Sequence, residues 1–289
     1  MGLKKLISLL VVLAVIIGFA LLLPRNTEAP RDIRVAATIF PLQDMAQNIV
    51  GDTMTVGLIL PAGASPHTFE PTPSTLRDLQ STELVFAVGH GLDDWTQTLV
   101  NNSPAEIVTV DRGIQLLASD EGDGADPHYF LTIENAKIIV TTMHDELILL
   151  FPEYRDEFSV NTQNYLQSLD AAEAQIQTIL ADSQDKPLIT LHDGWYYFAE
   201  AYGIKIAGTF EPTAGREPTP QYLVELKDAV KSTGTTTIYS EPQLSIESIN
   251  SFVSDYNLKV AELDPIGGYE NRDSYINLML YNVHVIAAN

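Results

Sequence analysis

The chain has 289 residues, 45% of them hydrophobic, which suffices for one large or two modest domains with buried cores. Its 16 basic and 38 acidic residues give a net charge of −22, so the chain should repel nucleic acid and anionic lipid and attract cations. Acidity of this kind also serves many secreted proteins simply as a means of staying soluble. There is no cysteine, which excludes disulfides and thiolate metal sites.

The N-terminus carries a membrane-directed signal. Lys4 and Lys5 precede an uncharged apolar run over residues 6–23, which as a helix would just span a hydrocarbon core. The run ends in Leu-Leu-Leu-Pro without a convincing small-residue cleavage site, so it favours an uncleaved transmembrane anchor over a cleaved signal helix. Residues 1–32 are therefore expected to form an anchor or signal helix followed by a polar linker. Either kind of helix would place the rest of the chain outside the cytoplasmic membrane. Three arginines after the apolar run weaken the usual excess of positive charge on the cytoplasmic side.

Short apolar and amphipathic segments alternate over residues 34–110. Strands are predicted at residues 34–39, 55–60, 83–88 and 106–110. Helices are predicted at residues 42–50, 73–80 and 93–100, the second with Thr72 as N-cap and Pro73 in its first turn. Such alternation is typical of a parallel sheet covered by helices.

The middle of the chain is helical throughout. One helical pattern covers residues 133–150, and a second covers residues 154–182 without glycine or proline to kink it. At 1.5 Å per residue the second would be a rod of about 40 Å, long enough to cross a whole domain.

Alternation then resumes to the C-terminus. Strands are predicted at residues 187–191, 205–209, 236–240 and 259–263, and helices at residues 195–202, 220–231, 246–256 and 275–288. The predicted fold class is therefore α/β, with two lobes that each contain a mostly parallel sheet flanked by helices, joined by one long helix. The expected domains are an N-terminal lobe at 33–152, the linking helix at 153–184 and a C-terminal lobe at 185–289.

Four side chains are candidate metal ligands because each follows or borders a predicted strand or helix. His67 lies in a loop stiffened by prolines (PHTFEPTP), His128 in Asp-Pro-His before a helix, and His192 directly after a strand. Asp264 follows the strand at 259–263. Ligands of open α/β sheets bind at this rim, and three imidazoles with one carboxylate suit Zn²⁺.

Several motifs, in this order, resemble the solute-binding proteins of zinc and manganese ABC importers, a two-lobe family with a rigid linking helix. The motifs are AATIFPL at 36–42, PHTFEPTP at 66–73, DPH at 126–128, ENAK at 134–137, HD at 192–193, EPQ at 241–243 and LDPIGG at 263–268. The resemblance covers residues 34–289 and implies metal ligation by His67, His128, His192 and Asp264.

The resemblance also implies a function. The chain is expected to be an extracytoplasmic receptor, not an enzyme, that captures Zn²⁺ and delivers it to an ABC permease as a monomer without nucleic acid. Mn²⁺ is the less favoured ion, because manganese-preferring relatives commonly carry glutamate at the position of His192. Many relatives are tethered by a lipidated cysteine, which this chain lacks, so the apolar N-terminus is expected to tether it to the cytoplasmic membrane.

Other readings remain open at this point. A surface adhesin with a structural metal would unfold on metal removal, and a metallohydrolase would need an open coordination position with a base such as Glu241 or Asp193. As an alternative role, Asp193 and Glu241 could orient the ligand imidazoles. His90 is expected in a solvent-facing turn, and His144 and His284 on helices.

Overall fold

The computed structural model describes residues 33–100, 105–119, 124–183, 186–211 and 218–289, and residues 33–289 form one compact unit. The predicted N-terminal span lies outside the described residues. In the described part of the chain, no helix combines the length and the apolar character needed to cross a membrane.

The first sheet is parallel, and its two central strands are buried on both faces. Its strands are β1 (Val35–Ala37), β2 (Val56–Leu58), β3 (Leu84–Ala87) and β4 (Glu106–Thr109), in the order β2-β1-β3-β4. Alternate residues enter different cores: Leu84 and Phe86 face the main core, whereas Val85 faces a smaller one. This burial on both sides explains why β1 and β3 read as continuous apolar runs.

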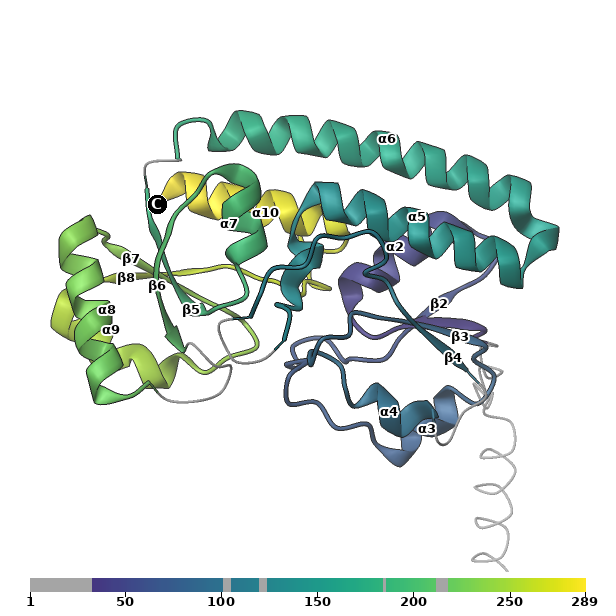
Figure 1. Cartoon of the computed structure of the whole chain (residues 1–289), viewed down its shortest axis with the longest axis horizontal. Coiled ribbons are helices and arrows are strands. Elements are labelled where there is room, and N and C mark those ends of the chain that lie inside the picture. Colours follow the sequence, from purple (N-terminus) through teal and green to yellow (C-terminus); the bar gives the residue numbers. More distant parts are fainter. Residues whose placement is uncertain (1–32, 101–104, 120–123, 184–185, 212–217) are drawn as a thin grey trace, which may run out of the picture. The chain divides into compact units, whose positions relative to one another are not determined.

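The helices of this N-lobe lie on both sides of its sheet (Figure 1). They are α2 (Phe40–Val50), α3 (Pro73–Asp78), α4 (Thr96–Val100) and α5 (Ile133–Leu150), with a 3-10 turn at His128–Leu131 before α5. The predicted cap of α3 is confirmed, since the Thr72 side chain accepts a hydrogen bond from the Thr75 amide.

The predicted rod is α6 (Arg155–Leu180), which follows a 3-10 turn at Pro152–Tyr154 and spans about 39 Å. It crosses above both lobes in Figure 1 and packs against α2, α5 and the C-terminal helix α10 (Tyr275–Ala288). Its buried side chains recur every three or four residues along one face, which is why the pattern was readable: Phe158, Thr162, Tyr165, Leu169, Ala172, Ile176 and Leu180.

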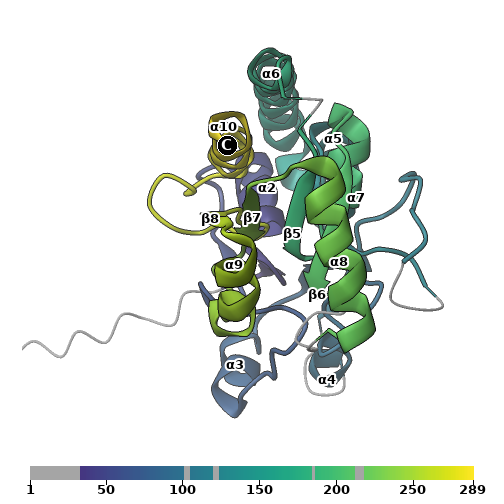
Figure 2. The same cartoon turned by 90° about the vertical axis from the view of Figure 1, so that its left-hand side faces the viewer.

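The second sheet repeats the strand order of the first. Its parallel strands are β5 (Leu188–His192), β6 (Ile206–Glu211), β7 (Thr237–Ser240) and β8 (Lys259–Glu262), in the order β6-β5-β7-β8. The helices that follow them are α7 (Tyr196–Tyr202), α8 (Pro220–Thr233) and α9 (Asn250–Tyr256), in addition to α10. Figure 2 shows α8 and α9 in front of the sheet strands.

The fold therefore matches the predicted class, with two parallel sheets flanked by helices and a long helix between the lobes. The boundaries predicted at residues 152 and 184 stay a prediction, because one apolar core continues from the N-lobe through α6 into Leu263, Ile266 and α10. In each sheet the first strand lies between the second and third, which creates a switch point where parallel sheets present binding loops beyond their strand ends.

Candidate metal centre

His67 lies in the loop after β2 and is half-buried. The loop is fixed from outside, because the indole of Trp95 donates a hydrogen bond to the Pro66 carbonyl at 3.1 Å and stacks edge-on against Phe69. Burial, followed by the charges of His128 and His192, lowers the pKa of His67 to about 2. The imidazole is therefore neutral at physiological pH, which is the form that binds a metal.

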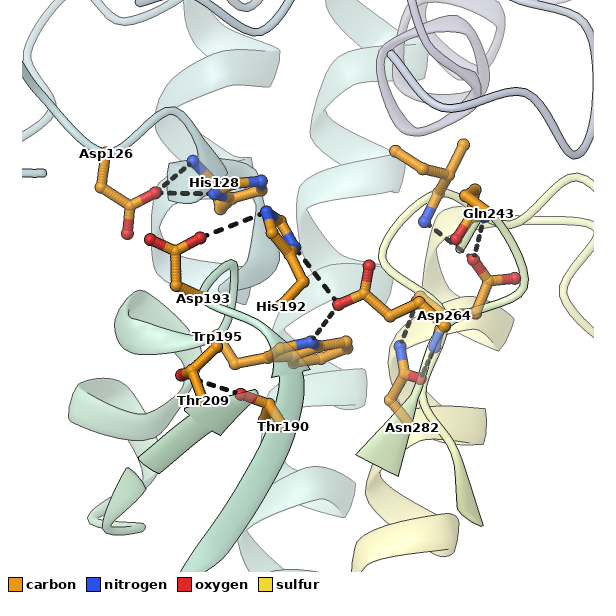
Figure 3. Close-up of polar contacts among 12 residues, drawn as sticks. Asp126, His128, Thr190, His192, Asp193, Trp195, Thr209, Gln243, Asp264 and Asn282 are labelled. Carbon is orange, nitrogen blue, oxygen red and sulfur yellow. Dashed lines mark hydrogen bonds and ion pairs between the residues drawn. The ribbon is translucent and has the colours of Figure 1, made fainter. Parts of the chain in front are cut away.

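His128 begins the 3-10 turn before α5 and is almost fully buried. One oxygen of Asp126 accepts hydrogen bonds from the His128 amide at 2.9 Å and lies 2.8 Å from its Nδ1 (Figure 3). With the Nδ1 proton directed at this carboxylate, the lone pair is on Nε2. That Nε2 is buried and has no hydrogen-bond partner among the described residues, which is what a metal-binding nitrogen requires.

His192 is the last residue of β5 and is equally buried. Its Nδ1 lies 3.4 Å from Glu241, which also accepts a hydrogen bond from the Trp195 indole at 2.9 Å, and its Nε2 lies 3.2 Å from Asp193 (Figure 3). Burial opposes ionisation of the Glu241 carboxyl, but the charge and hydrogen bond of His192 and the Trp195 hydrogen bond hold its pKa below the usual value. A carboxylate thus orients His192 as Asp126 orients His128.

The three histidines converge on one point from both lobes. One nitrogen of each lies within 4.8 Å of the others, and the ring centroids are 4.9 to 5.4 Å apart. Two nitrogens on one tetrahedral Zn²⁺ are about 3.3 Å apart, given bonds of about 2.0 Å. The arrangement therefore needs only a small inward movement to bind an ion.

The metal-sized group found among the described residues contains the three histidines but not Asp264. It is fully buried after β8, and its Oδ1 accepts hydrogen bonds from the Gln243 side chain and from the amides of Ile266 and Gly267. Pro265 and Ile266, next to Asp264, line the same cavity as the three imidazoles. Ligation by Asp264 thus stays a prediction.

The remaining histidines are elsewhere. His90 has a left-handed backbone (φ 55°) and lies 2.8 Å from Asp111, while His144 on α5 lies 3.0 Å from the Ser159 hydroxyl. His284 is exposed on α10. None of them belongs to the metal-sized group found in the described residues.

Two residues beside the site were not singled out from the sequence. Asp126 precedes His128 by two positions, a spacing at which an aspartate can accept from the later amide, so the signal was present in the Asp-Pro-His motif. Gly194 packs directly on the imidazoles: a Cβ atom there would lie 2.9 Å from His192 Cε1 and 3.1 Å from His128 Nε2. No local pattern marks that glycine.

Comparisons with known proteins identify the family of this chain. Residues 35–289 match the family model described as "ZnuA: Zinc-uptake complex component A periplasmic". The chain is 28% identical over 265 residues to the manganese-binding lipoprotein MntA of Halalkalibacterium halodurans, covering 89% of this chain and 88% of that protein. It is 27% identical over 304 residues to the manganese ABC transporter substrate-binding lipoprotein PsaA of Streptococcus anginosus, covering 98% of each.

Solved structures are similar over the same region. A crystal structure of ZnuA has a TM-score of 0.80 at 28% identity, covering 88% of this chain and 98% of that one. The solute-binding protein FpvC of P. aeruginosa in complex with Ni²⁺ has a TM-score of 0.77 at 25% identity, covering 89% and 96%.

Proposed function

This chain belongs to the ZnuA family of periplasmic zinc-uptake components, and we propose that it captures Zn²⁺ between its lobes and delivers the ion to an ABC permease. The members of this family are substrate-binding proteins of ABC importers and not enzymes. The observation that carries the proposal is the convergence of His67, His128 and His192 within 4.8 Å, two from the N-lobe and one from the C-lobe.

The donor set suits a divalent ion of borderline softness. The imidazoles are buried or half-buried, His67 is neutral, and the Nε2 of His128 has no hydrogen-bond partner among the described residues. Carboxylates behind His128 and His192 orient the rings and raise their basicity. These features support a built site in preference to a chance cluster.

Zn²⁺ is the proposed cargo and Mn²⁺ the second candidate. Relatives are named both as manganese-binding and as zinc-binding proteins, so family membership alone does not choose the ion. Three nitrogen donors favour zinc, whereas manganese prefers oxygen. Asp264 is proposed as the fourth ligand, supplying one oxygen from the C-lobe.

The protein is proposed to act outside the cytoplasmic membrane and to pass its ion to an ABC permease in that membrane. Relatives include the substrate-binding lipoprotein of a manganese ABC transporter, which supports this partner class. An N-terminal tether and a monomeric state remain parts of the proposal, to be tested by membrane fractionation of the full chain and by light scattering.

The direct test is metal analysis of protein purified without added metal, followed by calorimetric titration with Zn²⁺ and competition with Mn²⁺. One ion per chain and preference for Zn²⁺ are expected, with binding lost in His67→Ala. A chain that binds neither ion above non-specific levels would overturn the proposal.

The choice of ion is tested separately with His192→Glu. Replacing a borderline nitrogen by a hard oxygen should shift the ratio of Zn²⁺ to Mn²⁺ affinity toward Mn²⁺ by about tenfold or more. The exposed His284→Gln variant is the control and should leave the ratio unchanged. Unchanged selectivity in His192→Glu would contradict the assignment of that ligand.

A further inference from the structure

Asp264, the proposed fourth ligand, already has a cationic partner in the protein. Its Oδ2 lies 3.0 Å from an Arg272 nitrogen, while its Oδ1 accepts three hydrogen bonds. The side chain of Asp264 is fully buried, so water does not reach the carboxylate of this ion pair. Oδ2 has no directed hydrogen bond to any of the described residues, so charge alone holds it.

Arg272 is built into its position. The same nitrogen also lies 2.9 Å from Glu262, the last residue of β8, and the guanidinium lies over the rings of Tyr281 and Tyr269, 4.5 and 5.1 Å from their centroids. A tight turn fixes its backbone, because the Gly268 amide donates to the Arg272 carbonyl and the Arg272 amide donates to Tyr269.

The backbone of Asp264 is held just as firmly. Its amide donates to the Asn282 side chain at 2.8 Å and its carbonyl accepts from the same side chain at 2.7 Å (Figure 3). These two contacts fix the backbone from which the Asp264 carboxylate projects toward Arg272. A dication and a guanidinium compete for the same oxygen.

We propose that Arg272 is the internal counterion of Asp264, which the captured metal displaces, and that it thereby lowers metal affinity to a level that permits release. The inference rests on the proposed function and concerns a positioning residue, not a ligand. Without metal, the Arg272 charge offsets the cost of burying the Asp264 carboxylate. When a metal ion binds Asp264, the positive charge of Arg272 repels that ion.

The experiment compares wild type with Arg272→Gln in the full chain, purified metal-free. Zn²⁺ affinity is measured by competition with a chelator, and thermal unfolding is followed with and without Zn²⁺. R272Q should bind Zn²⁺ at least about threefold more tightly, because no cation competes for Asp264. Its metal-free form should unfold at a lower temperature, and its zinc-dependent rise in Tm should exceed that of wild type.

A second variant should change the Zn²⁺ affinity in the opposite direction. Glu262→Gln removes the other partner of Arg272, so the arginine should hold Asp264 more strongly and Zn²⁺ should bind less tightly. Glu270→Gln removes the same charge from an exposed position of the adjoining turn and controls for the long-range field. Arg112→Gln, which breaks exposed ion pairs with Asp145 and Glu146, controls for loss of a guanidinium.

The outcomes separate the two hypotheses. Wild type that fails to bind Zn²⁺ would remove the proposed function itself. Wild type that binds, with affinity in R272Q unchanged or weaker and with equal losses of Tm in the metal-free and loaded forms, would reduce Arg272 to a packing residue.

Discussion

At the scale of single residues, the absence of a side chain matters as much as the ligands. Gly194 has an ordinary backbone conformation, so other residues could adopt it, yet its Cα faces His128 and His192 at a distance that leaves no space for a methyl group. The two imidazoles come from different lobes. Gly194 therefore allows them to approach each other.

Gly194→Ala should weaken Zn²⁺ binding by about tenfold or more, as displacement of an orienting neighbour does in other metal sites. The free energy of unfolding should fall by about 1–3 kcal/mol, because the added methyl group crowds the two imidazoles even though the backbone conformation suits alanine. Calorimetry of the variant checks this, with Gly124→Ala as the matched control, since a Cβ at Gly124 meets nothing within 4 Å. Equal affinity in both variants would show that the imidazoles yield freely.

The lowered pKa of His67 makes stability depend on pH. In the unfolded chain His67 takes up a proton near pH 6.5, whereas in the folded protein it does so only near pH 2. Between these values the unfolded state binds more protons, so the free energy of unfolding falls as pH falls.

Metal-free protein should consequently lose stability below about pH 6.5, and His67→Gln should lose less over the same interval. Chemical denaturation at several pH values between 4 and 8 (about one unit apart) measures this. Parallel curves for the two proteins would contradict the burial of a neutral His67.

At the scale of elements, α10 serves both halves of the site. The Tyr275 hydroxyl donates hydrogen bonds to the carbonyls of Phe130 and Thr132, at the end of the turn that carries His128, at 2.8 and 3.0 Å. About two turns further along the helix, Asn282 holds the backbone of Asp264. A single helix thus fixes one proposed ligand from each lobe.

Tyr275→Phe should lower the free energy of unfolding by about 1–3 kcal/mol, because buried carbonyls lose a donor. Zn²⁺ binding should weaken with it, since the His128 turn loses its anchor. Denaturation and titration of the variant measure both, and Tyr256→Phe, in the small C-lobe core around Phe252, is the control. Lost stability with full zinc affinity would separate α10 from the site.

The elements themselves were largely predictable because burial imposes strong periodicity. α5 and α10 begin and end where the sequence predicts, and α8 begins at the predicted Pro220, with the Thr219 side chain as its cap. The predicted helix at 246–256 was wrong in its first turn, which is 3-10. The helix predicted from Asp93 begins at Thr96, because the Asp93 carboxylate accepts from the Val88 and Gly89 amides instead.

The site was predictable in its residues more than in its geometry. Positions at the boundaries of predicted strands and helices identified His67, His128 and His192 as candidates, and the structure brings them together. The orienting role of Asp126 and the contact of Gly194 depend on how loops from distant segments fold against each other, which no periodicity encodes. The Arg272 pair is equally non-local, since only the turn at 267–272 brings that guanidinium back to β8.

At the scale of the whole molecule, the lobes share one core beneath α6. The buried face of α6 packs against helices of both lobes, and the main apolar cluster contains residues of both sheets. Separating the lobes would expose that cluster to water. Metal binding should therefore act through small tilts and loop movements, not a wide hinge.

Because the chain has no cysteine, two can be introduced for labelling, at the exposed Asp78 on α3 and Asp255 on α9. The distance between spin labels at these sites should change by less than about 2 Å on addition of Zn²⁺. Labels at the exposed Asp156 and Gln177, near opposite ends of α6, provide the rigid reference. A shift of many ångströms would contradict a common core.

The matched strand order of the two sheets has a mechanical consequence. Each sheet contributes a pair of the proposed donors at its rim, so the cargo acts as a cross-link between two facing edges. A modest parting of the edges would strip the ion of half its contacts in a single event. Retention would then fall steeply with separation, and a transporter that grips both rims could unload the protein with a displacement far smaller than the length of the rod above it.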